Sequence, residues 1–203
     1  MSQPQSPTNQ EVQGVFSPFL RNQRLRKAAA HISRGSIVLD IACGLGSLAE
    51  HLDSSCTYYG VDRIPFSDAL KPKASCKTHF LECDVSKETA LEEITGWMES
   101  KPTVITMLAF LEHLPSPAEV VGRFMGLLNE GGHLLGTTPH PMGRTLHDVL
   151  AKVRLCSPDG ADEHEEFLNR NRLAAVARES GAEMVDYGRF LLGLNQYFKF
   201  SRI

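Results

Sequence analysis

The sequence predicts an α/β fold with a doubly wound, mostly parallel β-sheet and helices on both faces. Short apolar runs alternate with helical patterns from residue 36 to residue 139, as strands and helices do in such sheets. The early runs are apolar throughout, which is typical of strands buried on both faces. The last segment, "NQYFKFS", alternates apolar and polar residues instead, which predicts an antiparallel final strand.

The first half of the chain supplies three expected strands. Residues 12–33 carry apolar residues at helical spacing and stop before Gly35, so one or two helices are expected there. "SIVLDIA" predicts the first strand, and "SLAEHL" predicts a helix that begins near Gly46. "TYYGVD" and "CKTHFLECD" predict two more strands, ending on Asp62 and Asp84.

The second half continues the alternation and then interrupts it. The expected elements are a helix over 86–99, a strand over 102–110, a helix over 116–128 with Ser116 as cap and Pro117 in its first turn, and a strand over 133–139. An irregular segment follows over 139–161, with a short helix near 144–155. The last expected elements are a helix over 162–180, with Asp162 and Glu165 as a capping box, and strands near 183–191 and 195–202.

Composition narrows the classes of function. The 203 residues are 42% hydrophobic with a net charge of −3, so one ordinary core is expected and nucleic acid is not a favoured partner. We interpret the basic residues Arg21, Arg24, Arg26 and Lys27 as a solvated helix face. Five cysteines without a Cys-x-x-Cys pair predict a reduced, cytoplasmic protein without a disulfide framework.

No targeting signal is expected from the N-terminal residues or from the apolar runs. Residues 1–11 are polar and lack a signal-peptide pattern, so a disordered tail is expected, followed by a single domain over 12–203. No apolar run is long enough to span a bilayer.

The turn within "SIVLDIACGLGSLAEHL" is the first candidate binding feature. Gly44 and Gly46 allow a tight turn and close approach of a ligand to the backbone. This pattern alone also fits a dinucleotide cofactor. Asp40 ends the strand before the turn and would repel a pyrophosphate, whereas it would attract an amino group and a sulfonium. The turn therefore favours S-adenosylmethionine.

"VLDIACGLG" resembles the first signature of class I S-adenosylmethionine-dependent methyltransferases, with Ala42 where a glycine often stands. "YYGVD", "ECDV", "LAFLEHLP" and "LNEGGHLLGTTP" resemble the segments that follow in that family, so the likeness is close over residues 36–140. The resemblance implies a Rossmann-like methyltransferase domain. It implies that Asp62 accepts from both ribose hydroxyls and that Asp84 accepts from the adenine amino group. The cofactor-binding residues expected from it are Asp40, Ala42, Cys43, Gly44, Gly46, Asp62, Arg63, Asp84, Val85 and Leu108.

Methyl transfer is an in-line displacement that depends on positioning and exclusion of water, and an oxygen nucleophile also needs a base. His113 and His140 follow two strands and are the candidate bases, ahead of His147 and His164. A metal site of the Glu-x-x-Glu-His type is not expected, because Ala109 stands where its first glutamate would be.

Residues 12–33 and 139–161 lie outside the core alternation and are the expected cover over the acceptor. Their apolar residues suit a lipid-like, aromatic or sugar-lipid small molecule, and are Phe16, Phe19, Met142, Leu146 and Leu150. The expected assembly is a monomer or homodimer. Two alternatives stay open: a protein that binds the cofactor but serves a partner without catalysis, and a nicotinamide-dependent enzyme on the same fold.

Overall fold

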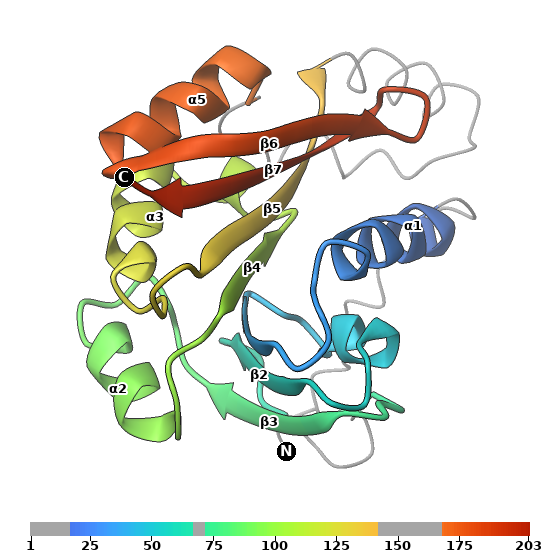
Figure 1. Cartoon of the computed structure of the whole chain (residues 1–203), viewed down its shortest axis with the longest axis vertical. Helices are drawn as coiled ribbons and strands as arrows, with labels where there is room; N and C mark the ends of the chain where they lie inside the picture. The colour runs from blue at the N-terminus through green and yellow to red at the C-terminus, as the bar shows by residue number, and fades with distance from the viewer. Residues whose placement is uncertain (1–16, 67–71, 142–167) are drawn as a thin grey trace, which may run out of the picture.

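A seven-stranded sheet forms the centre of the computed structural model, which describes residues 17–66, 72–141 and 168–203. The strand order is β3-β2-β1-β4-β5-β7-β6 (Figure 1). All pairs from β3 to β5 are parallel, and β7 pairs antiparallel with both β5 and β6. The strands are β1 (Ile37–Ile41), β2 (Thr57–Asp62), β3 (Lys77–Glu82), β4 (Val104–Leu108), β5 (His133–Pro139), β6 (Ala182–Phe190) and β7 (Asn195–Arg202). The predicted fold class is confirmed.

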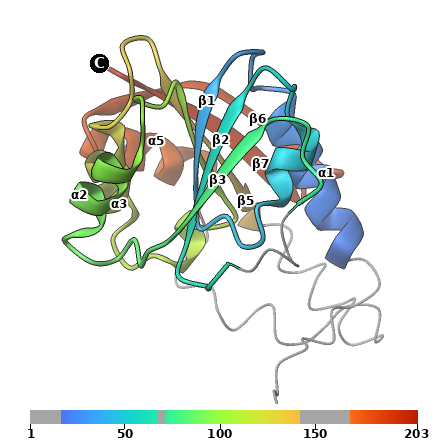
Figure 2. The same ribbon diagram turned by 90° about the horizontal axis from the view of Figure 1, so that it is seen from below.

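Helices cover both faces of this sheet. The helices are α1 (Ser17–Ala29), α2 (Ala90–Trp97), α3 (Pro117–Met125) and α5 (Arg170–Glu179), with 3₁₀ helices η1 (Ser47–His51) and η3 (Leu111–His113). In Figures 1 and 2, α2, α3 and α5 lie on one face, and α1 and η1 lie on the other. Within the described residues, no helix is long and apolar enough to cross a membrane.

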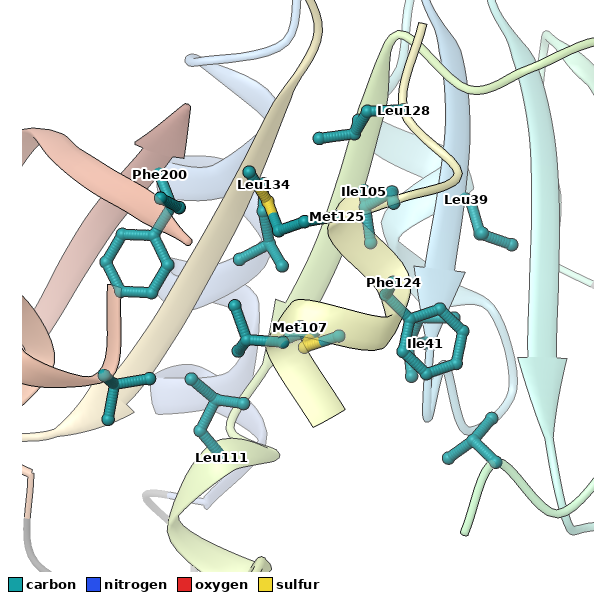
Figure 3. Packing of buried hydrophobic residues seen from close by; sticks show 14 of the residues in the cluster. Leu39, Ile41, Ile105, Met107, Leu111, Phe124, Met125, Leu128, Leu134 and Phe200 are labelled. Carbon is teal, nitrogen blue, oxygen red and sulfur yellow. The ribbon is translucent and has the colours of Figure 1, made fainter. Parts of the chain in front are cut away.

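Two apolar layers hold the helices against the sheet. Alternate side chains of a strand point to opposite faces, so Leu39 and Ile41 of β1 pack under α2, α3 and α5, whereas Val38 packs under α1 and η1. Figure 3 shows part of the larger layer, around Phe124 and Met107. Asp40 shares the parity of Val38 and therefore faces the α1 side of the sheet.

Helix starts differ most from the sequence predictions. The segment after Gly46 is a five-residue 3₁₀ helix rather than an α-helix. The Ser116 side chain makes no capping hydrogen bond, although Pro117 does begin α3 as predicted. The last helix begins at Arg170 rather than at residue 162, because Asn169 is extended and its side chain accepts from the backbone N–H of Arg172. The Asp162–Glu165 capping box and the short helix near 144–155 lie outside the described residues.

Candidate cofactor site

The predicted acidic residues meet at one edge of the sheet. Asp40 lies in β1, Asp62 ends β2, and Asp84 follows β3, all toward the carboxyl ends of these parallel strands. The strand order reverses between β1 and β4, and ligands of doubly wound sheets bind outside the carboxyl ends at such a reversal. The sequence pattern thus brings these three carboxylates to the edge where a ligand is expected.

The glycine-bearing turn after β1 is tied directly to the end of β2. The Gly44 N–H donates to Asp62 Oδ2 at 2.7 Å, and the Ile64 N–H donates to Asp62 Oδ1 at 3.1 Å. Gly44 and Gly46 have φ of 56° and 74°, and Ala42 has φ of 57°. Left-handed backbone favours glycine, so Ala42 carries local strain of a kind that concentrates at functional sites.

A small cavity, here called the Asp40 cavity, lies between this turn and helix α1. Its volume is about 200 Å³, and it brings opposite charges together: the Asp40 carboxylate on one side and the guanidinium groups of Arg21 and Arg24 on the other. Its lining residues are Arg21, Arg24, Leu25, Asp40, Ala42, Cys43, Gly44, Leu45, Ser47 and Leu108. A ligand group that carries both an ammonium and a carboxylate would match this arrangement.

A larger cavity, here called the Asp62 cavity, meets the first one at Ala42. Its volume is about 700 Å³, and it combines acidic groups with apolar surface. Asp62, Arg63, Asp84, Val85 and His113 all line it, as do Ala109 and Phe110. Carboxylates can accept from a ribose diol and from an amino group on a base, and apolar side chains can cover the faces of the base.

Asp40 is buried, with 3% of its surface exposed. Tyr58 Oη donates to its Oδ2 at 2.7 Å, and Thr106 Oγ1 donates to its Oδ1 at 2.5 Å. Burial raises the pKa of Asp40 to about 6, although the two hydroxyl donors oppose that rise. The carboxylate is therefore charged above about pH 6, where it can attract a cation.

Asp84 has a more exposed setting. Its Oδ1 accepts from both the backbone N–H and the hydroxyl of Ser86, at 3.1 and 2.7 Å. These two bonds lower the pKa of Asp84. Its carboxylate is thus held in its ionised form at the rim of the Asp62 cavity, which suits an acceptor of hydrogen bonds.

The two candidate bases have different settings. His113 is exposed and lines the Asp62 cavity. His140 is buried, its backbone N–H donates to the Leu194 carbonyl, and burial lowers the pKa of its imidazole. Neither His140 nor Gly46 is among the described residues that line the two cavities. His147 and His164 lie outside the described residues, among which no group of three potential metal ligands comes together.

The polar residues of the site that were not predicted as such include Arg21, Arg24, Tyr58 and Thr106. The interpretation as a solvated helix face is wrong for Arg24, which is half-buried and lines the Asp40 cavity; Arg21 is exposed, as expected for such a face, but it lines the same cavity. Phe19, expected in an apolar cover, is 54% exposed and is absent from both linings. The three-residue spacing of the arginines places them on one side of α1, but no sequence signal says which side faces the sheet.

Gly60 makes room for the Tyr58–Asp40 contact. It lies opposite Asp40 in the β1–β2 register, and a Cβ at this position would come within 2.9 Å of Cys43 Sγ, Phe80 Cδ1 and Tyr58 Cε1. Because these groups are packed under the turn, Gly60→Ala is expected to lower the free energy of unfolding by about 1–3 kcal/mol. Urea denaturation followed by circular dichroism measures this loss.

Gly96→Ala is the matched control for that variant. Gly96 lies in α2, and a Cβ there would meet nothing within 4 Å. It should be neutral or should raise stability by about 0.5–1 kcal/mol, since alanine favours helix over glycine. Equal stability of the Gly60→Ala and unaltered proteins would contradict the tight packing described above.

Comparison with known proteins places this site in a family. The ubiquinone biosynthesis O-methyltransferase of Colwellia psychrerythraea is 31% identical over 159 residues, which are 73% of this chain and 61% of that protein. The protein of the same name from Burkholderia pseudomallei is 30% identical over 169 residues, which are 78% of this chain and 69% of that one. The chain thus spans slightly less than two thirds of the length of the first relative and slightly more than two thirds of the length of the second.

Solved structures agree on the fold. The 1,6-didemethyltoxoflavin-N1-methyltransferase of Burkholderia thailandensis was solved with S-adenosylhomocysteine and has a TM-score of 0.62 at 18% sequence identity. The match covers 89% of this chain and 76% of that protein chain. The magnesium protoporphyrin IX methyltransferase of Synechocystis has a TM-score of 0.58 at 13% identity, with coverage of 92% and 83%. The sequence profile described as a methyltransferase domain matches residues 17–187. The resemblance noted in the sequence is confirmed: the chain belongs to the methyltransferase domain family.

Proposed function

We propose that S-adenosylmethionine binds across both cavities, with its amino-acid end in the Asp40 cavity and its adenosine in the Asp62 cavity. The observation that carries this proposal is that one carboxylate and two guanidinium groups line the same Asp40 cavity. An amino acid has the complementary pair of charges. Asp40 would accept from its ammonium, and Arg21 or Arg24 would donate to its carboxylate.

The Asp62 cavity supports the other half of the proposal. Asp62 would accept from the ribose hydroxyls, and Asp84 would accept from the adenine amino group beside Val85. Asp62 already receives one backbone N–H on each oxygen, which fixes the direction of the remaining lone pairs. The bound cofactor supplies an electrophilic methyl group, and these residues hold it in place.

The acceptor is proposed to be a hydroxyl group of a lipid-like or aromatic small molecule. The named activity of the two curated relatives, O-methylation in ubiquinone biosynthesis, supports a hydroxyl acceptor. His113 lines the Asp62 cavity and would take the hydroxyl proton, with His140 as the alternative base. The four cysteines in the described segments are free, which agrees with the reduced, cytoplasmic location that we also propose, as a monomer or homodimer.

Calorimetric titration with three ligands tests the cofactor proposal. S-adenosylhomocysteine should bind, 5′-methylthioadenosine should bind more weakly because it lacks the amino acid, and NAD should not bind. Arg24→Gln should weaken S-adenosylhomocysteine by roughly tenfold or more, the range for a lost charged hydrogen bond, and should leave methylthioadenosine unchanged. Arg26→Gln, on the same helix but exposed, is the control.

Two outcomes would overturn parts of this proposal. Tighter binding of NAD than of S-adenosylhomocysteine would favour the nicotinamide alternative. Equal weakening of both adenosine ligands by Arg24→Gln would mean that Arg24 does not contact the amino-acid end.

A separate turnover assay tests catalysis. Turnover of cofactor to S-adenosylhomocysteine with any hydroxyl acceptor would exclude a purely non-catalytic role.

A further inference from the structure

The Asp40 carboxylate is held from both neighbouring strands. Thr106 of β4 lies directly opposite Asp40 in the parallel register, and Tyr58 lies two residues before Gly60, the partner of Asp40 in β2. Each hydroxyl donates to a different carboxylate oxygen. The side chain therefore cannot rotate without breaking one of these bonds, and the cavity edge is where its remaining lone pairs can find a partner.

The hydroxyl groups of Tyr58 and Thr106 stabilise the charged form of Asp40. Tyr58 is fully buried and Thr106 is fully buried, so neither finds water as an alternative partner. Burial also raises the pKa of Tyr58 well above its ordinary value, which keeps its hydroxyl protonated as a donor. A buried hydroxyl that donates to a carboxylate stabilises the charged form of that carboxylate.

The charges around Asp40 come from three elements. Arg21 and Arg24 face it from α1 across the cavity, and Arg24 in turn lies near the buried Glu112. Asp62 at the end of β2 opposes its ionisation. The Cys43 thiol of the turn also lines the cavity, and burial raises its pKa, so it stays neutral. In the described part of the chain no basic side chain pairs with Asp40 within salt-bridge distance, so the two hydroxyls are its direct partners.

We propose that Tyr58 and Thr106 are positioning residues that hold Asp40 charged and aimed at the amino group of the cofactor. This inference rests on the proposed placement of the amino-acid end of the cofactor in the Asp40 cavity. It makes cofactor binding proton-linked. The carboxylate of the free protein titrates at about pH 6, and a bound ammonium favours its charged form, so binding near pH 6 releases protons.

The sign of the effect follows from this linkage. Affinity for S-adenosylhomocysteine is expected to be full above about pH 6.5 and to fall as the pH drops through 6. Loss of either hydroxyl makes the charged carboxylate less stable, so the same fall occurs at a higher pH. The amino group of the ligand is at least as basic as the α-amino group of a peptide and stays largely protonated below about pH 7.5, so the measurement is made from pH 5 to pH 7.5.

The test is calorimetric titration of the full chain from pH 5 to pH 7.5 with S-adenosylhomocysteine and, separately, with methylthioadenosine. In Tyr58→Phe and in Thr106→Val, the midpoint of the fall in affinity should move upward by about half a pH unit or more, the effect of removing one of two or three donors. That corresponds to roughly a threefold loss near pH 6. Methylthioadenosine, which lacks the amino group, should show no such fall in any of these proteins.

Three controls separate positioning from general damage. Thr106→Ser keeps a hydroxyl and should keep the original midpoint. Tyr59→Phe removes a hydroxyl from the neighbouring residue, whose ring packs on the other face with His79 and Trp97, and should also leave the midpoint in place. Titration in two buffers of different ionisation heat gives the number of protons released, which a merely structural role would not change.

The outcomes distinguish this inference from the cofactor proposal. Unmoved midpoints in both Tyr58→Phe and Thr106→Val, with the ligands still bound, would overturn the positioning role and leave the cofactor proposal intact. A matching pH dependence for methylthioadenosine would also overturn it, because the titrating group would then act on the adenosine. Absence of binding by both ligands in the unaltered protein would overturn the cofactor proposal itself, and with it this inference.

Discussion

Asp62→Ala is expected to weaken S-adenosylhomocysteine binding by about 1.5–3 kcal/mol, or roughly 10- to 150-fold. Two losses contribute to this effect. The variant removes the proposed acceptor for the ribose hydroxyls, and it also removes the carboxylate that binds the Gly44 and Ile64 N–H groups. Because the glycine-bearing turn is tied to β2 through Asp62, its backbone is no longer held in the shape that a ligand needs. Calorimetric titration at pH 7.5 measures the loss.

Asp53→Ala is the matched control for this experiment. Asp53 also accepts two bonds from a neighbouring residue, Ser55, and it lies in the turn before the amino end of β2, at the opposite edge of the sheet from the site. Its loss should leave the affinity unchanged. If Asp62→Ala folds normally and binds as tightly as the unaltered protein, the ribose site lies elsewhere and the assignment of the Asp62 cavity is wrong.

The sequence could predict the edge of the sheet at which Asp62 lies because the information is local. An apolar run that ends on an aspartate marks a buried strand and its carboxyl end, and parallel strands place such ends together. The observed bounds of β2 and of β5 agree with the segments "TYYGVD" and "HLLGTTP". For the same reason, the polar and apolar alternation of β7 correctly predicted its antiparallel pairing.

Contacts between distant segments could not be predicted in this way. The Thr106–Asp40 bond joins residues 66 positions apart, and it exists because the β1–β4 register sets them opposite each other. Register depends on how whole strands pack, and a single sequence does not state it. Arg24 reaches the site through the orientation of α1 on the sheet, which its low amphipathicity leaves unspecified.

The second large effect concerns the antiparallel part of the sheet. Phe198 of β7 is fully buried and lies opposite Gly136 of β5, where a Cβ would overlap its ring. Its ring also packs against that of Phe200, with 4.7 Å between centroids. Phe198→Ala should therefore lower the free energy of unfolding by about 3–5 kcal/mol, since it removes a buried ring and leaves a cavity over glycine backbone that no neighbouring side chain fills.

Urea denaturation tests this prediction. With a slope of about 1–3 kcal/mol per molar urea, the midpoint should fall by more than about 1 M in a single transition. Phe19→Ala is the control, since Phe19 is 54% exposed and its removal should change stability by only about 0.5 kcal/mol. A single transition would show that β6 and β7 unfold together with the parallel strands that carry the site. A loss of unfolding free energy below about 1 kcal/mol for Phe198→Ala, or a separate early transition, would contradict this prediction. The antiparallel strands would then unfold independently of the parallel strands, and the packing of the Phe198 ring over Gly136 would not stabilise the part of the sheet that carries the cofactor site.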